Sequence, residues 1–230
     1  NSTGNIFNGD VLFNNQPAGN FWIYPNSYGI NTQFNGNISV VNLNGSGVSF
    51  GANTGTSTLA PGKTISIGAA GFNSGGLVLK GFAQSGAGTP QSLITTGTSY
   101  IQYSTGSSFD GALSSSSPGL FFNGSVFNGT VQCVKTGTTN DQSQGNNVFN
   151  GPAVFTNNGT GYLMMTANNP DAYNDDVTFI KGNTGLVYPN YNGNSNYRRN
   201  LTVTSSSAIT FGSNTGTATL SGAGLQTINA

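Results

Sequence analysis

Charged side chains are scarce in this sequence and make up only 5% of its 230 residues, against roughly 25% in an ordinary globular protein. Histidine and glutamate are absent, so six Asp, four Lys and two Arg carry all the charge and the net charge is zero. Nucleic-acid binding depends on a positive surface that neutralises phosphates, and the one basic pair, Arg198–Arg199, does not supply it. Nucleic acids are therefore excluded as partners.

The same absences argue against catalysis. Without His or Glu, the general bases that remain are the Asp and Lys side chains, and no Gly-x-Ser-x-Gly nucleophile motif stands between a predicted strand and helix. A polysaccharide-cleaving β-helix enzyme would need two carboxylates across a cleft, and it stays open as an alternative. We predict no catalytic residue, no cofactor and no enzymatic activity.

Cysteine and long apolar runs are nearly missing as well. The single cysteine, Cys133, has no internal partner for a disulfide and alternates with valines in Val131–Val134. We therefore expect it to be a small buried apolar residue. No apolar stretch approaches the roughly 18 residues that span a bilayer, which predicts no membrane span in this segment.

What the sequence does contain is glycine, with 35 residues, and many Asn, Ser and Thr. Low-complexity disorder combines few aromatic residues with a high net charge, whereas aromatic residues here make up 11% and recur at regular places. No sustained helical apolar period is present. The composition therefore predicts an ordered all-β structure with polar outer faces.

A short motif recurs along the chain: an aromatic residue, Asn or Asp, Gly, any residue, and then alternating apolar residues. Asn-Gly readily adopts the positive φ of a tight turn, and the alternation after it predicts a half-buried strand. Through the last five copies the spacing is nearly regular. The copies begin at Phe7, Phe34, Phe109, Phe127 and Phe149, with looser versions at Tyr173 and Tyr197.

A turn and strand repeated at intervals of roughly 20–25 residues fit one coil of a parallel β-solenoid, or β-helix. In that fold each coil stacks on the one before it, and aromatic and aliphatic side chains form inward ladders. Tandem antiparallel β-sandwiches are the alternative, because they also show short strands with a turn at intervals of roughly 8–12 residues. The constant turn motif and the scarcity of proline favour the solenoid.

Residues 70–108 lack a clear copy of the motif, yet they contain strand patterns. Leu77–Leu79, Ser92–Ile94 and Tyr100–Tyr103 are predicted as further strands. The serine run Ser114–Ser117, followed by Pro118, is predicted as a loop from its composition.

A much longer stretch of sequence occurs twice. Phe50–Leu59 and Phe211–Leu220 have nearly the same residues. Other matches keep the same order: Asp10–Phe13 with Asp176–Phe179, and Tyr24–Asn26 with Tyr188–Asn190.

This long repeat divides the chain into three parts. Residues 1–69 form a first partial copy, residues 70–171 form intervening coils of the same repeat, and residues 172–230 form a second partial copy, all within one continuous array. We expect a repeat seen less than twice to be a window cut from a larger array.

Three stretches, Leu59–Ile67, Gly71–Leu79 and Val148–Tyr162, resemble a repeat of giant secreted surface proteins from gliding and predatory bacteria of the Bacteroidota type. The resemblance covers essentially the whole chain. It implies export by the type IX route, an extracellular location at the cell surface, and a structural or adhesive role in a filament used for attachment, gliding or prey capture. Surface glycans or other cells are its candidate partners, and a carbohydrate-binding β-helix protein is the alternative.

One acidic cluster suggests a weak metal site. Asp171, Asp175 and Asp176 lie close in sequence to several Asn side chains, and Ca²⁺ takes about six to eight oxygen ligands of these kinds. The other interpretation is a solvated turn before the strand that starts at Val177. We therefore predict no metal and keep these three residues as weak calcium candidates.

Two further patterns have both a functional and a structural interpretation. Trp22 and Tyr24 would suit a platform that stacks on sugar rings, but Trp22 corresponds to Leu186 in the second copy, which favours core packing. The alternating threonines of Thr54–Thr58 and Thr215–Thr219 are typical of ice-binding solenoids. Because the two runs belong to separate copies of the long repeat and cannot be adjacent coils, we predict solvated strands instead.

The low charge also predicts how the protein behaves in solution. Without His or a dense charge network, we expect stability to change little with salt, or with pH between about 5 and 9. Long-range repulsion between chains is weak at zero net charge. We therefore expect self-association into a homo-oligomeric fibre in which copies pack side by side.

Overall fold

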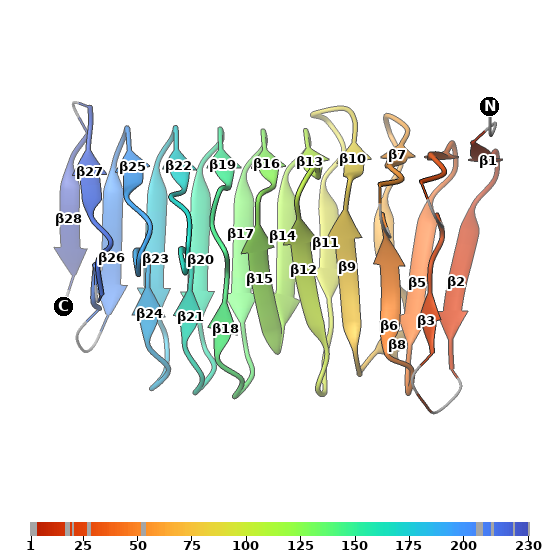
Figure 1. Ribbon diagram of the computed structural model, residues 1–230, viewed down its shortest axis with the longest axis horizontal. Coiled ribbons are helices and arrows are strands. Elements are labelled where there is room, and N and C mark those ends of the chain that lie inside the picture. Colours follow the sequence, from red (N-terminus) through yellow and green to blue (C-terminus); the bar gives the residue numbers. More distant parts are fainter. Residues whose placement is uncertain are drawn as a thin grey trace.

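The computed structural model describes residues 4–16, 19, 21–26, 29–51, 54–205, 209–212, 214–222 and 224–229, without the side chains of 228 and 229. Every regular element among them is a β-strand. The strands stack into a long body with the two chain termini at opposite ends (Figure 1). All paired strands run parallel. The predicted parallel β-solenoid is confirmed, and the antiparallel sandwiches are excluded.

The coils contribute strands to three sides of the body. Sheet 1 stacks β1 (Asn5–Phe7), β4 (Thr32–Phe34), β7 (Ser57–Leu59), β10 (Phe82–Gln84), β13 (Ser108–Phe109), β16 (Val126–Phe127), β19 (Val148–Phe149), β22 (Ala172–Tyr173), β25 (Ser195–Tyr197) and β27 (Ala218–Leu220). Sheet 2 stacks β2 (Val11–Asn15), β5 (Ile38–Asn42), β8 (Ile65–Phe72), β11 (Gln91–Ile94), β14 (Leu113–Ser117), β17 (Val131–Lys135), β20 (Ala153–Asn157), β23 (Val177–Lys181), β26 (Leu201–Ser205) and β28 (Gln226–Asn229).

The third side is formed by two shorter sheets. Sheet 3 contains β3 (Trp22–Ile23), β6 (Gly47–Phe50), β9 (Gly76–Lys80), β12 (Tyr100–Ser104) and β15 (Gly119–Asn123). Sheet 4 continues it with β18 (Asp141–Gln142), β21 (Leu163–Met164) and β24 (Val187–Tyr188). A parallel bridge between Asn123 and Gly145 connects the coils where one sheet gives way to the other.

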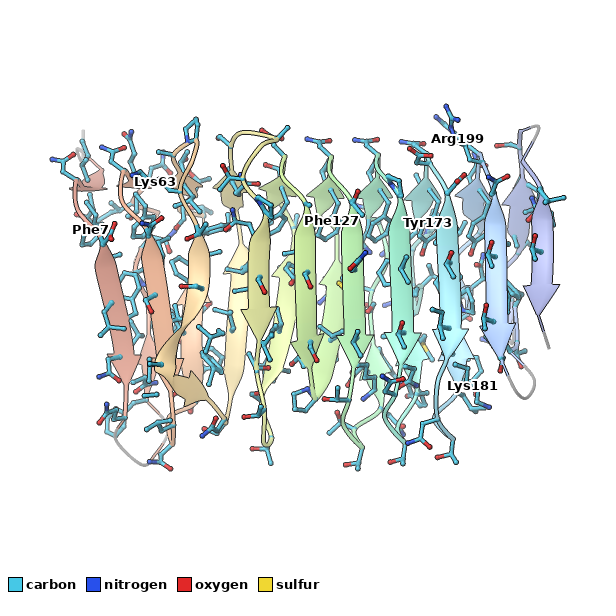
Figure 2. The ribbon with its side chains drawn as sticks, turned by 180° about the vertical axis from the view of Figure 1, so that it is seen from behind. Phe7, Lys63, Phe127, Tyr173, Lys181 and Arg199 are labelled. Atoms are coloured by element: carbon cyan, nitrogen blue, oxygen red, sulfur yellow. The ribbon has the colours of Figure 1, made fainter. Side chains whose placement is uncertain are left out.

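The aromatic residues of the recurring motif form a row of stacked rings in the core. Phe109, Phe127, Phe149, Tyr173 and Tyr197 face one another in consecutive strands of sheet 1, so the spacing of the motif equals the length of a coil. The rings of Phe127 and Phe149 stack with their centroids 5.0 Å apart, and those of Phe149 and Tyr173 are also 5.0 Å apart. Figure 2 shows Phe127 and Tyr173 along this row.

The Asn and Gly of the motif also stack from coil to coil. Asn128 Nδ2 donates to Asp110 Oδ1 at 2.8 Å, and Asn150 Nδ2 donates to Asn128 Oδ1 at 2.7 Å. Where two glycines of the motif stack, their backbones approach too closely for a side chain: a Cβ atom on Gly129 would lie 2.5 Å from the backbone of Gly111. Every residue of the motif therefore has a structural role.

The long repeat also fits the coils. Leu59 ends β7 and Leu220 ends β27, and these strands are seven positions apart in sheet 1. One copy of the long repeat therefore spans seven coils. Sheets 1 and 2 run without interruption through both partial copies and the residues between them.

The strands predicted in residues 70–108 are confirmed as β9, β11 and β12. The loop predicted for Ser114–Ser117 is wrong, because these residues belong to β14 and pair with β11 and β17 on either side. Ser115 and Ser117 point inward and are buried. Pairing on both edges and hydroxyl partners inside the coil outweigh the low strand propensity of a serine run.

Candidate functional site

Seven of the twelve charged residues lie at one corner, where sheet 1 turns into sheet 2. Figure 2 shows Lys63 and Arg199 along this upper edge, and Lys181 at the opposite edge. The seven are Asp10, Lys63, Asp110, Asp175, Asp176, Arg198 and Arg199.

Carboxylates at this corner accept hydrogen bonds from backbone N–H groups of the next coil. Asp10 Oδ1 accepts the backbone N–H of Asn37 at 2.7 Å, and Asp176 Oδ1 accepts that of Asn200 at 3.0 Å. The hydrogen bond from the Asn37 backbone lowers the pKa of Asp10. Asp10 and Asp176 are matching positions of the long repeat, so the repeat preserves this contact seven coils further on.

The structure does not bring the three calcium candidates together. Asp171 is 2% exposed and points into the coil, whereas Asp175 Oδ1 lies 3.7 Å from Nε of Arg199 at the surface. Asp176 Oδ1 accepts a hydrogen bond from the backbone N–H of Asn200. Among the described residues, no group of three or more His, Cys, Asp or Glu side chains has the arrangement of a metal site.

Asp171 is a buried carboxyl group without a cationic partner among the contacts of the described residues. Its Oδ1 accepts the backbone N–H and Nδ2 of Asn147, each at 2.9 Å, and the hydroxyl of Tyr173 lies 3.3 Å from Oδ2. Burial raises the pKa of Asp171 from an ordinary 3.8 to about 7, although the hydrogen bonds from Asn147 oppose the shift. This carboxyl group therefore titrates near neutral pH.

A second buried acid, Asp141, does have a cation. Lys135 Nζ lies 3.2 Å from Asp141 Oδ2, and neither side chain is exposed. The backbone N–H of Leu120 also donates to Oδ2 at 2.8 Å, and Thr139 donates to Oδ1 at 3.0 Å. Burial raises the pKa of Asp141, while the Leu120 N–H and the Lys135 ammonium offset part of that rise. The pair joins the corner after β17 to sheet 4.

Cys133 is buried as predicted. Its sulfur lies 3.0 Å from the hydroxyl of Ser115, one coil earlier. Burial raises the pKa of the Cys133 thiol to about 12, so the reactive thiolate does not form at neutral pH. Cys133 is a packing residue of the core.

A polar pocket of about 400 Å³ opens at the charged corner near the C-terminal end, and Asp176, Arg198, Arg199 and Asn200 line it. It contains one carboxylate and two guanidinium groups. Retaining or inverting glycosidases need a second carboxyl group roughly 5–10 Å away, and no second one lines this pocket.

The third side of the body has a different character. Eight aromatic residues of the described chain lie outside the core, and all eight lie in or next to strands of sheets 3 and 4. We call the outer surface of these two sheets, which faces the viewer in Figure 1, the aromatic face. Its aromatic residues are Phe21, Trp22, Tyr24, Tyr100, Phe121, Tyr162, Tyr188 and Tyr191.

The prediction that Trp22 packs in the core is wrong. Trp22 pairs with Gly47 while its neighbour Ile23 pairs with the fully buried Val48, so Ile23 points inward and Trp22 outward. The Trp22 and Tyr24 rings stack at 6.1 Å with an interplanar angle of 18°. These two residues form a surface platform.

The threonine side chains are solvated as predicted, but the strands cover only part of each run, because only Thr58 in β7 and Thr219 in β27 belong to a strand. Thr54, Thr56 and Thr58 are all exposed, and so are Thr215, Thr217 and Thr219. They lie seven coils apart, so they do not form one array.

Comparison of the chain with protein-family models, curated proteins and solved structures found no match. None of the described residues forms a helix of the length and apolarity needed to cross a membrane.

Proposed function

We propose that this chain is a structural and adhesive segment of an extracellular cell-surface filament or adhesin, and that it is not an enzyme. The observation that carries the proposal is the use of the recurring motif. From Phe109 to Phe149, where copies of the motif lie in adjacent coils, its aromatic ring, amide side chain and glycine each stack on the matching residue of the neighbouring coil. The repeated residues are therefore the ones that join one coil to the next. Export by the type IX route and a role in attachment, gliding or prey capture belong to this proposal through the sequence resemblance.

The use of the carboxylates supports a structural role. Asp10, Asp110 and Asp176 accept hydrogen bonds from the next coil, and Asp141 pairs with Lys135 inside the body. A cleaving enzyme would instead need two carboxyl groups open to one cleft.

Antibody labelling of cells that make the protein tests the proposal. We expect intact cells to be labelled, with the label on filaments or on the cell surface. Label that appears only after the cells are permeabilised would overturn the proposed location and role.

Self-association into a fibre is part of the proposal, and the outer surface of sheet 2 is suited to it. Along its ten strands the outward positions hold Ser, Thr, Val, Ile, Leu, Ala, Asn, Gln and Gly. The two lysines of this sheet, Lys135 and Lys181, are buried. We call this surface the flat face.

The size of the flat face suits a second copy of the chain. Ten strands about 4.8 Å apart and about five residues long give an area of about 600–700 Å², close to the roughly 800 Å² per partner of a stable interface. Short uncharged side chains allow two such faces to approach closely without repulsion.

Placing a charge on the flat face should abolish side-by-side packing. Thr178 is a half-buried outward residue of β23, and Thr178→Lys would place an ammonium group within the contact, where it has no partner. Mass photometry at micromolar concentration should then detect monomers, while the unmodified chain forms larger species. Thr58→Lys, on the exposed side of sheet 1, is the matched control and should still associate. An unmodified chain that stays monomeric would remove the fibre from the proposal.

A further inference from the structure

The aromatic face has a feature that core packing does not require: two of its rings lie over glycines of the neighbouring coil. Trp22, Gly47, Gly76, Tyr100 and Gly119 occupy one outward row across sheet 3. A Cβ atom on Gly76 would lie 2.3 Å from Cζ of the Tyr100 ring, and one on Gly47 would lie 2.7 Å from Cζ3 of the Trp22 ring. The Tyr100 and Trp22 rings therefore cover the glycines of the neighbouring coil, and both side chains stay half-exposed on the outer side of the sheet.

Seven of the eight aromatic residues fall into three clusters of contacting rings along the body, and Phe21 is the eighth. The first contains Trp22 and Tyr24 at β3, the second contains Tyr100 and Phe121 at β12 and β15, and the third contains Tyr162, Tyr188 and Tyr191 at β21 and β24. Strands β3 and β12 are three coils apart, and β12 and β21 are three further coils apart along the same side (Figure 1). With strands about 4.8 Å apart, neighbouring clusters are about 14 Å apart.

Polar groups accompany the rings of the middle cluster. Tyr100 and Phe121, whose rings meet edge to face at 5.6 Å, line a pocket of about 250 Å³ together with Pro118 and the exposed Thr98 and Thr138. Their hydroxyl groups are donors and acceptors next to an aromatic wall. Ligand sites of small polar molecules combine an apolar wall with a few such groups.

Charge is nearly absent from this side. Sheets 3 and 4 contain two charged residues, Lys80 and Asp141, and Asp141 is buried against Lys135. Gly47 and Gly76 lie between Trp22 and Tyr100 in one row, and Gln102 lies beside Phe121 in another, so the first two clusters form no contiguous apolar patch of the kind that marks a protein interface. The surface suits an uncharged ligand that alternates apolar and polar edges.

We propose that the aromatic face binds a neutral linear polysaccharide that lies along the axis of the body. The C–H faces of a pyranose ring carry partial positive charge and pack on the negative face of an aromatic ring, while the sugar hydroxyls reach Thr98, Thr138 and Gln102 at the middle cluster. An extended sugar chain advances by about one coil spacing per ring, so the clusters take sugars three positions apart. This inference rests on the proposed adhesive function and names the partner class of that surface.

Binding of defined oligosaccharides to the full chain tests the proposal. The probes are neutral gluco-, xylo-, manno- and chito-oligosaccharides of two to eight sugars, with an acidic uronic-acid polymer as the charged comparison. Trp22 is the single tryptophan of the chain, so its fluorescence reports contact at the first cluster directly. We expect at least one neutral series to bind, with an affinity that rises at least about tenfold once the chain is long enough to reach two clusters.

Variants of single clusters locate the site. Tyr100→Ala should weaken binding of the long oligosaccharides about tenfold or more, while Tyr100→Phe, which keeps the ring, should retain it. Ile94→Ala is the matched control, because Ile94 is 60% exposed on the flat face in the strand before β12. Circular dichroism and thermal unfolding show whether each variant keeps the fold, and Tyr188→Ala replaces Tyr100→Ala if that variant unfolds.

Each other result would overturn the inference. These results are the absence of binding to every neutral series, binding of the acidic polymer alone, an affinity that does not depend on chain length, or equal binding by Tyr100→Ala and Ile94→Ala. Association through this face with a second copy of the chain, lost in Tyr100→Ala, would assign the face to self-assembly instead. A chain that is displayed on cells but binds no glycan would leave the proposed structural function standing.

Discussion

Replacing Phe149 by alanine should lower the free energy of unfolding by about 3–5 kcal/mol, the range for removing a fully buried aromatic ring. Phe149 is 0% exposed and its ring lies between those of Phe127 and Tyr173, each 5.0 Å away and nearly parallel. Phe155 packs edge-on at 5.2 Å. Because a coil contacts only its neighbours, the cavity cannot be filled from elsewhere, and the loss is a large part of a typical stability of about 5–15 kcal/mol.

Urea unfolding followed by far-UV circular dichroism measures this loss. Val154→Ala is the matched control, because Val154 belongs to the same coil but points outward from β20 and is half-buried; it should cost about 1 kcal/mol or less. If both variants lose the same stability, the aromatic stack is not what holds neighbouring coils together.

The aromatic stack was predictable because, in a solenoid, residues that stack in space recur in the sequence at the length of a coil. Matching residues of two coils lie side by side only when the spacing of a motif equals the length of a coil. The nearly regular spacing of the motif therefore indicated which residues pair between neighbouring strands: Phe109, Phe127, Phe149, Tyr173 and Tyr197. The matching carboxylates Asp10 and Asp176 were visible for the same reason. Side chains that stack on their own kind leave a period, and a period can be found from the sequence alone.

Residues that occur at only one coil produce no periodic pattern, and their positions were the ones that could not be predicted from the sequence. Trp22 lies on an outward row whose next members are Gly47 and Gly76, so its role depends on glycines in the two coils that follow it. Strand alternation alone does not say which side is the outer one when the flanking turns are irregular. Aligning the sequences of successive coils places each of these aromatic residues in one row with a glycine. Such a row indicates an outward-facing aromatic residue.

Asp171 is a second feature of this kind, and it changes the expected pH dependence of stability. In the inward row that contains Asp171, at the start of the sheet 1 strands, the neighbouring coils have the buried residues Ser125, Asn147 and Ser195, so an acid at this position departs from the row. As a turn residue it would have been solvated. Because the row points inward, its carboxyl group is desolvated, and the expectation of constant stability between about pH 5 and 9 no longer holds.

We expect the free energy of unfolding to fall as the pH rises from about 4 to 7. Asp171 has a pKa of about 7 in the folded chain against an ordinary 3.8, so in this range the folded state holds a proton that the unfolded state has released. Because the folded state binds more protons than the unfolded state, its stability falls as the pH rises. The contribution is fully present below pH 4 and is lost as the pH passes through about 7, with a total of up to about 4 kcal/mol at about 1.36 kcal/mol per pKa unit.

Asp171→Asn should remove most of this slope and make the chain more stable than the unmodified one at pH 8. The amide is neutral at every pH, its oxygen still accepts the two hydrogen bonds from Asn147, and the row already holds an asparagine one coil earlier, at Asn147. Asp176→Asn, an exposed carboxyl group one turn away, is the control and should keep the slope. Thermal and urea unfolding between pH 4 and 8 measure both variants, and any slope left in Asp171→Asn belongs to the buried Asp141. An unmodified chain that is equally stable at pH 4.5 and pH 8 would mean that Asp171 keeps its charge inside the coil, stabilised by the hydrogen bonds of Asn147 and Tyr173 alone.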